Sequence, residues 1–172
     1  GFIKVNPTVP LRSFYYWKHE YKISHYEDST VISLGIKKIY VKFFDVTLSE
    51  SGAAPISVLS FDSLSLRSNI EYVPVIFITQ AVLLHTDENM IDSLASQIVT
   101  KTMRMAERER LTPKEIQLDC DWAAHTKNKY FRLVEIITKL VAQKNMITSC
   151  TIRLHQVKYK KEAGLPPCDQ GM

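Results

Sequence analysis

Cysteine, glycine and long apolar runs are scarce or absent in this chain of 172 residues. Its three cysteines, Cys120, Cys150 and Cys168, lack the spacing of metal ligands, and their odd number leaves at least one thiol unpaired. Its five glycines form no G-x-G-x-x-G turn and no P-loop, so the common nucleotide-binding motifs are missing. No run of about 18 or more apolar residues occurs, so we expect no transmembrane segment.

The chain is basic, but its positive charge is spread along the sequence. The net charge is +4, and the one local cluster consists of Lys158, Lys160 and Lys161. A nucleic-acid-binding surface gathers basic residues on one face with aromatic residues among them. We therefore interpret the cluster as a solvated loop and expect no nucleic-acid partner. With 45% hydrophobic residues, the chain is long and apolar enough for one domain with a substantial core.

Strand-like and helical segments alternate along the chain. Strands are predicted at residues 13–17, 36–45, 72–79, 115–122 and 151–156. Helices are predicted at residues 28–34, from 86 or 87 to 110, and 126–145. This order predicts an α/β protein with a parallel sheet covered by helices.

The run 115–122 is the segment around which the predicted site is built. Strand side chains alternate between faces, so Gln117, Asp119 and Asp121 share one polar face. The opposite face is apolar and includes Cys120, which we interpret as a small buried side chain rather than a nucleophile.

The run 151–156 repeats this alternation, with Arg153 and His155 on its polar face. A helical crossover of about twenty residues joins the two runs, which makes the strands parallel and places both polar ends at one edge of the sheet. That edge is the predicted site.

Two architectures fit alternating strands and helices. A doubly wound sheet usually carries a glycine-rich nucleotide turn, which is missing here. A (β/α)8 barrel places its working residues at the carboxyl ends of several strands, where the polar residues of this chain lie. We therefore predict a partial (β/α)8 TIM-type barrel of about five parallel strands.

A whole barrel needs about 250 residues, more than this chain has. We predict that residues 1–172 form a single domain, the N-terminal part of a TIM-like barrel. Residues 1–12 are an irregular lead-in, and 158–172 are a loop that ends before the next strand. Because the first residue is Gly1, we expect a processed or trimmed chain. The missing half of the barrel is expected from a longer polypeptide or a second chain.

The acids of the predicted site suggest glycoside chemistry. Glycosidases use two carboxyl groups, about 5–5.5 Å apart in retaining enzymes and about 6.5–9.5 Å apart in inverting ones. The Cα atoms of Asp119 and Asp121 are expected to lie about 6.5 Å apart. Asp121 is the candidate acid, base or nucleophile, and Asp119 supports it. The structural alternative is a buried ion pair between Asp119 and Arg153. His155 either shares protons and binds a hydroxyl or is a satisfied core histidine.

Five further residues are candidates for binding a sugar. Trp122 and Trp17 either stack on a sugar ring or pack, and Lys18, Lys42 and Gln156 are polar candidates near strand ends. Asp45 is a weaker candidate at the end of its strand. No H-E-x-x-H or G-x-S-x-G motif occurs, so we predict neither a metal nor a serine nucleophile, and no cofactor.

Several runs together resemble a known protein family. They are 116–122 (Ile-Gln-Leu-Asp-Cys-Asp-Trp), 151–156 (Thr-Ile-Arg-Leu-His-Gln), 129–131, 164–167, 72–79 and 40–45. In these runs the chain resembles an uncharacterised family of exported bacterial proteins, often lipoproteins, which is similar to TIM-barrel glycoside hydrolases. The resemblance implies a barrel, a sugar-like ligand and export to the periplasm or the outer membrane. The chain departs from the family by ending where the next barrel strand is expected.

Two functions follow as hypotheses. The first is a carbohydrate-active, glycoside hydrolase-like protein of the bacterial cell envelope. The alternative is a non-catalytic glycan-binding or scaffold protein that keeps the barrel without its chemistry. A phosphate or nucleotide binder would need an anion-binding loop at a helix start, and the sequence contains no such loop.

Overall fold

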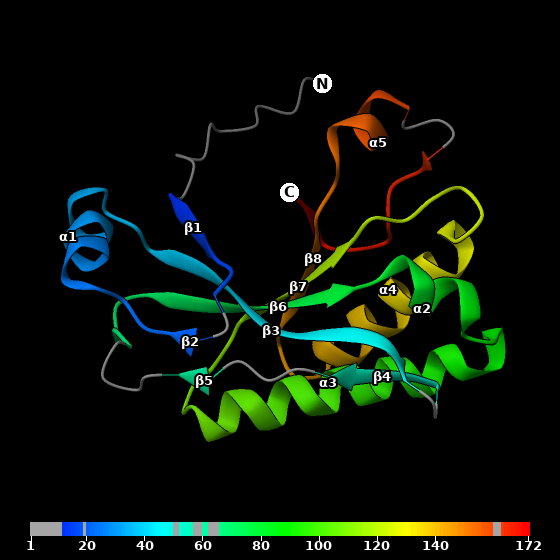
Figure 1. Ribbon diagram of the computed structural model, residues 1–172, viewed down its shortest axis with the longest axis horizontal. Helices are drawn as coiled ribbons and strands as arrows, with labels where there is room; N and C mark the ends of the chain where they lie inside the picture. Colours follow the sequence, from blue (N-terminus) through cyan, green and yellow to red (C-terminus); the bar gives the residue numbers. More distant parts are fainter. Residues whose placement is uncertain (1–11, 19, 50–51, 57–59, 62–65, 160–162) are drawn as a thin grey trace, which may run out of the picture.

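The computed structural model describes residues 12–18, 20–49, 52–56, 60–61, 66–159 and 163–172. Its main sheet has seven strands, six of them parallel, in the order β1-β3-β6-β7-β8-β9 (Figure 1). These strands are β1 (Ser13–Tyr16), β3 (Lys38–Ser49), β6 (Glu71–Ile78), β7 (Glu115–Cys120), β8 (Ile147–Cys150) and β9 (Gln170–Gly171). The seventh, β4 (Gly52–Ile56), pairs antiparallel with β3, while β2 (Glu20–Tyr21) and β5 (Ser60–Phe61) form a small parallel pair.

The helices connect the parallel strands. They are α1 (His25–Ser33), α2 (Gln80–His85), α3 (Ile91–Arg108), α4 (Lys127–Ala142) and α5 (Leu154–Lys158), with a 3-10 turn, η2 (Glu88–Met90), before α3. Figure 1 shows the two long helices, α3 and α4, packed side by side against one face of the curled sheet. This arrangement is the predicted α/β half-barrel.

The core lies between the sheet and these two helices. Ile116 and Leu118 of β7 are fully buried there with Leu133 and Ile137 of α4. Because strand side chains alternate, the residues between them, including Gln117, project from the opposite, inner face of the curl. The polar face predicted for the run 115–122 is therefore the inner face.

The last predicted strand is displaced in the structure. We predicted residues 151–156, but β8 is Ile147–Cys150, and α5 begins at Leu154. Helix α4 ends at Ala142, and Asn145 turns the chain with a φ of 57°, so the strand starts earlier than the polar alternation indicated. The alternation of Arg153 and His155 belongs to the segment that follows the strand.

The C-terminal segment also differs from the prediction. We expected a loop over residues 158–172 that ends before the next strand, but β9 pairs with β8 in parallel register at Ser149 and Cys150. The short pair is continued by the N–H of Met172, which donates to the carbonyl oxygen of Cys150 at 2.9 Å. A sixth parallel strand therefore joins the predicted five. Of the predicted lead-in 1–12, only Arg12 belongs to the described residues.

Helix α1 begins earlier than the predicted residues 28–34 because of a capping box. The hydroxyl oxygen of Ser24 accepts a hydrogen bond from the backbone N–H of Glu27 at 3.3 Å. A carboxylate oxygen of Glu27 accepts one in return from the N–H of Ser24 at 2.9 Å. These bonds satisfy donors that the first helical turn leaves unpaired, which fixes the helix start.

The capping box predicts a pH dependence of stability. The hydrogen bond from the Ser24 backbone, together with Lys18 and the Ser24 side chain, lowers the pKa of Glu27 to about 2. A carboxyl group whose pKa is lower in the folded state stabilises the fold at pH values above its unfolded pKa, near 4.5. This stabilisation is lost as the pH falls towards the folded pKa of about 2. In Glu27→Gln the amide oxygen still accepts the capping bond but does not titrate. We expect the drop in urea midpoint between pH 7 and pH 3 to be smaller in Glu27→Gln than in the parent. An equal drop in both proteins would show that Glu27 does not contribute to the pH dependence of stability.

Candidate active site

A buried polar network lies deep on the inner face of the sheet. Glu115 of β7 is fully buried, and its carboxylate accepts hydrogen bonds from Lys38 Nζ at 2.7 Å, Tyr40 Oη at 3.1 Å and Ser149 Oγ at 2.5 Å. Burial by itself lowers the pKa of Lys38, but the hydrogen bond and the charge of Glu115 outweigh it, with a smaller contribution from Glu71, so the pKa is raised. The network joins β3, β7 and β8 beneath the site.

An aromatic stack leads from this network towards the carboxyl end of β1. The Tyr15 ring stacks on Tyr40 with centroids 4.8 Å apart and on Trp17 with centroids 5.7 Å apart. Tyr15 Oη donates to Gln117 Oε1 at 2.6 Å, which fixes the ring against β7. Trp17, directly after β1, is 46% exposed. The stack therefore presents a fixed aromatic surface at the open end of the curl.

A β-bulge in β3 brings a lysine and an acid to the same face. The register of β3 against β6 shifts between Lys42 and Phe44, so Phe43 is an extra residue. Phe43 and Phe44 both lie in the core, and Lys42 and Asp45 both face inward. Lys42 Nζ is 2.7 Å from Asp45 Oδ1, an ion pair that lacks hydrogen-bond geometry. Without the bulge, residues three apart would project from opposite faces.

Three residues from neighbouring strands and one residue directly after β8 then form a single row, which we call the rim row. It consists of Asp45, Phe77, Asp119 and Thr151. Asp45 pairs with Phe77 and Phe77 with Asp119 in the strand register. Thr151 follows β8 and donates its backbone N–H to the carbonyl oxygen of Leu118. Lys42 Nζ lies 5.5 Å from the centroid of the Phe77 ring.

Asp119 is the most strongly held acid of the rim row. Thr151 Oγ1 donates to Asp119 Oδ1 at 2.5 Å, and Arg153 Nη2 lies 3.5 Å from the same oxygen. The Asp119 side chain is only 7% exposed, whereas that of Arg153 is 47% exposed. The expected pairing of Asp119 with Arg153 is thus observed. Arg153, however, follows β8 rather than lying in it, and its side chain is partly exposed to solvent, so the pair is not fully buried.

Asp121 lies beyond the end of β7 and is exposed. It comes directly after β7, two residues along the chain from Asp119. Asp45 lies two strands from Asp119, so the Cα atoms are separated by about 10 Å at the usual strand spacing. Both side chains face the inner side of the curled sheet, on either side of Phe77 in the strand register.

The structure removes three residues from the predicted set of sugar contacts. Trp122 is 4% exposed and stacks on Tyr130 at 5.0 Å, so it packs in the core. Gln156 is buried, accepting from the N–H of Arg153 at 2.8 Å and donating to the Trp122 carbonyl oxygen at 3.3 Å. Lys18 is exposed and pairs with Glu27 of α1 at 2.9 Å, away from the rim row.

Trp122 keeps the parity of Ile116, Leu118 and Cys120, which places it on the core side of the sheet, and Lys18 keeps the parity of Phe14 and Tyr16, which face α1. Gln156 lies beyond the end of β8 in α5, where strand alternation no longer sets the direction of its side chain. Gln156 has a positioning role instead, since it holds the backbone of Arg153 at the start of α5. His155 lies in α5, and its side chain belongs to the part of the chain outside the described structure.

Sequence reasoning missed Phe77 and Thr151 and undervalued Asp45. Phe77 belongs to an almost continuous apolar run, in which nothing distinguishes an inward from an outward residue. Thr151 was assigned to a strand without a role. Asp45 faces inward only because of the bulge. The two adjacent apolar residues Phe43 and Phe44, which interrupt the alternation, are the sequence feature that could have indicated the bulge.

Cys120, next to this edge, is not an activated thiol. Burial, together with the charges of Asp119 and Asp121, raises the pKa of Cys120 to about 12, so its thiolate is not populated at neutral pH. Within the described ranges, no three His, Cys, Asp or Glu side chains are grouped so that they could hold a metal ion. In the same part of the chain, no helix is long and apolar enough to cross a membrane.

Comparison with solved structures identifies the architecture. The spore cortex-lytic enzyme SleL of Bacillus megaterium QM B1551 aligns with a TM-score of 0.53 and 14% identity, over 86% of this chain and 36% of that one. A chitinase from Chromobacterium violaceum ATCC 12472 aligns with a TM-score of 0.58 and 11% identity, over 90% of this chain and 50% of that one. The fold is a partial TIM-type barrel.

This partial barrel spans about a third to a half of the length of those two solved structures. At such low identities the likeness concerns the fold and not the chemistry. No model of a protein family matches the chain, and no curated protein is similar to it in sequence.

Proposed function

We propose that this partial barrel belongs to a carbohydrate-active, glycoside hydrolase-like protein and contributes its site through the rim row and Asp121. The observation that carries the proposal is the gathering of three carboxylates on one strand-end edge of a curled parallel sheet. Two of them lie close to cations, Asp45 to Lys42 and Asp119 to Arg153. Barrel enzymes place their working groups at this edge.

The roles of the acids follow from their surroundings. Asp119 is nearly buried and held by Thr151 and Arg153, so it is suited to positioning rather than to proton transfer. Asp121 is exposed just beyond the end of β7, so we assign it the acid, base or nucleophile role. Asp45, across Phe77, is the second carboxyl group. A sugar residue bound over Phe77 would then have a carboxylate on either side.

The aromatic stack supports a sugar as the ligand. Trp17 is held at a fixed orientation by Tyr15, so little side-chain entropy is lost when a ring stacks on it. Its exposure at the open end of the curl leaves one face available. Phe14, three residues before Trp17 and on the opposite face of β1, is 47% exposed but lines a groove beside α1.

This pair of residues provides the first test. We expect Trp17→Ala to weaken binding of a recognised glycan about tenfold, equivalent to about 1.4 kcal/mol, while Phe14→Ala leaves it unchanged. Binding is measured by calorimetry on the whole protein, with the ligand chosen from a glycan array. Equal losses of glycan affinity in both variants would indicate that the substitutions destabilise the protein in general. If the parent protein binds no glycan on the array, the proposal is wrong.

A non-catalytic glycan-binding protein is the second candidate. Trp122 packs in the core and Arg153 is partly exposed, and neither observation distinguishes a hydrolase from a binding protein. Asp45 is paired with Lys42, an arrangement that a protein that only binds a glycan can also have. We further propose export to the bacterial cell envelope as a periplasmic protein or a lipoprotein, supported by the sequence resemblance. The remaining part of the barrel would come from a longer polypeptide or a second chain.

A further inference from the structure

Two of the three cysteines meet at the junction of β8 and β9, outside the candidate active site. Cys150 is the last residue of β8 and is fully buried in the core on the helix-covered side of the sheet. Cys168 precedes β9, is partly buried, and packs against the same core. Both thiols are free in the structure.

The pairing of β8 with β9 holds the two segments together. Gly171 is the register partner of Cys150, and the N–H of Asp169 donates to the carbonyl oxygen of Thr148 at 2.9 Å. A carboxylate oxygen of Asp169 also accepts from the N–H of Thr148 at 2.8 Å. The Cys168 thiol is directed forward along the strand, with Sγ 3.1 Å from the carbonyl oxygen of Gln170. This direction brings it towards Cys150.

The two thiols differ in reactivity, as the partners of a dithiol pair usually do. A hydrogen bond with Cys150 lowers the pKa of Cys168, whereas that bond and burial raise the pKa of Cys150. The thiolate is the nucleophile in thiol–disulfide exchange, so the more accessible Cys168 attacks first. Cys120 is fully buried and its pKa is raised to about 12, so its thiol is not expected to react as a thiolate.

From this geometry we propose that Cys150 and Cys168 form a reversible intramolecular disulfide that fastens β9 to β8. The oxidant is a disulfide compound. The Cys168 thiolate attacks one sulfur of that compound, forming a mixed disulfide and releasing one thiolate. The Cys150 sulfur, losing its proton to solvent, then attacks Cys168 Sγ and expels the second thiolate. One S–S bond is formed in the protein, two electrons pass to the oxidant, and two molecules of thiol are released.

The bond would constrain the strand at the edge of the sheet. Met172, the residue after β9, has its Sδ 3.2 Å from Gln117 Nε2 and 3.9 Å from Tyr15 Oη. Fastening β9 therefore also fixes one side of the aromatic stack beneath the candidate active site. Because a cross-link restricts the unfolded chain, the oxidised protein is expected to unfold at a higher temperature than the reduced protein.

The test uses the folded protein, treated with oxidised glutathione and digested with trypsin without reduction. We expect the peptide 145–153, with Cys150, to be linked to the peptide 162–172, with Cys168. The native protein should lose two of its three thiols and regain them with dithiothreitol. Cys168→Ser, which changes a partly exposed residue, should abolish the link, and Cys120→Ala should retain it.

Other outcomes overturn the proposal. A link between the Cys120 peptide, 115–127, and either of the other peptides would show that a different pair is in reach. A dimer joined through Cys168, or three thiols still titrating after prolonged oxidation of the folded protein, would show that Cys150 does not resolve the mixed disulfide. The readout is independent of glycan activity, so it does not depend on the proposed function.

Discussion

Asp121→Asn is expected to reduce glycan turnover by the whole protein by about 10²–10⁴-fold, the usual contribution of a general acid or base. The asparagine amide preserves the size of the side chain and removes its ability to exchange a proton. Asp121 is exposed beyond β7, so the substitution should leave the urea midpoint almost unchanged. Turnover is measured on the glycan that gives the strongest signal with the parent protein.

Two further substitutions separate the roles of the acids. Asp45→Asn should lower turnover as severely as Asp121→Asn if the two carboxyl groups lie on either side of the substrate. Asp119→Asn weakens the contact with Arg153 and should lower both turnover and stability, since Asp119 is nearly buried. Asp92→Asn, in an exposed pair with Arg132 on α3 and α4, is the matched control and should change neither.

The outcomes distinguish the two proposed functions. Unchanged turnover in Asp121→Asn would remove Asp121 from the catalytic set. If the parent protein binds a glycan but hydrolyses none of the panel, and if Trp17→Ala weakens that binding, the non-catalytic binding function is the correct one.

Lys38→Met is expected to lower the free energy of unfolding by about 3 kcal/mol or more, a larger loss than for Asp119→Asn. It removes the cationic partner of a carboxylate that is fully buried, and a buried charge without its partner costs about 3–5 kcal/mol. Tyr40 and Ser149 still donate to Glu115, so we expect the lower part of that range. The methionine keeps most of the apolar volume of the lysine stem, so cavity formation contributes little.

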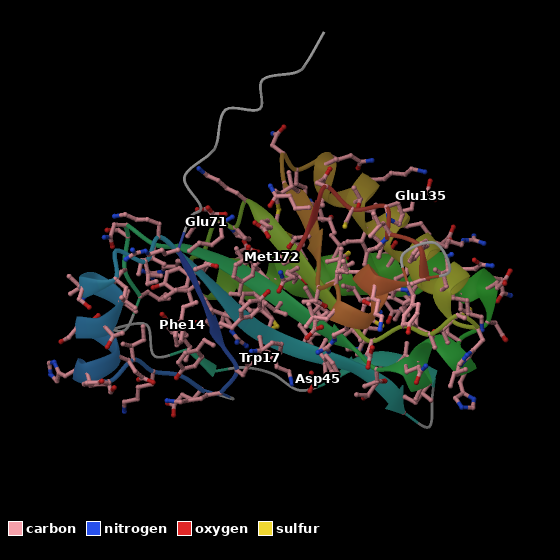
Figure 2. The ribbon with its side chains drawn as sticks, turned by 90° about the horizontal axis from the view of Figure 1, so that it is seen from above. Phe14, Trp17, Asp45, Glu71, Glu135 and Met172 are labelled. Atoms are coloured by element: carbon pink, nitrogen blue, oxygen red, sulfur yellow. The ribbon has the colours of Figure 1, made fainter. Side chains whose placement is uncertain are left out.

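Lys139→Met is the control for this prediction. Lys139 is paired with Glu135 at 2.6 Å, a distance as short as that between Lys38 and Glu115, but both side chains are exposed on α4. Figure 2 shows Glu135 at the surface of the molecule. Exposed pairs contribute little because water screens them, so the variant should unfold close to the parent. Both are followed by urea denaturation at pH 7. Equal midpoints for the two variants would show that the buried network does not hold the strands together.

The parallel α/β order was predictable because it depends on local patterns. Apolar runs of strand length alternate with helical stripes, and the crossover lengths force parallel pairing. The polar face of β7 was also predictable, since alternation holds for as long as the strand continues. Figure 2 shows Trp17, which follows β1, and Asp45 of the neighbouring strand β3 close together on one side of the molecule. The carboxyl ends of parallel strands are expected to meet in this way.

Predictions failed where the strand ended or its register shifted. Gln156 is predicted near the end of a strand over residues 151–156, yet it lies in α5, where it is buried and donates to the carbonyl oxygen of Trp122. The displaced strand β8 follows from the turn at Asn145, a backbone conformation that sequence periodicity does not report. Both errors arose from extending a period-two pattern past the last residue paired in the sheet.

The sequence by itself determined which segments become strands, their parallel direction, and the polar edge they share, because hydrophobic periodicity and crossover length act locally. Only the tertiary structure decided which side chains meet there. The bulge at Phe43 turns Asp45 inward, and the pairing of β3, β6 and β7 aligns it with Phe77 and Asp119. Such alignment depends on register between segments distant in the chain, and register is set by packing rather than by any one segment.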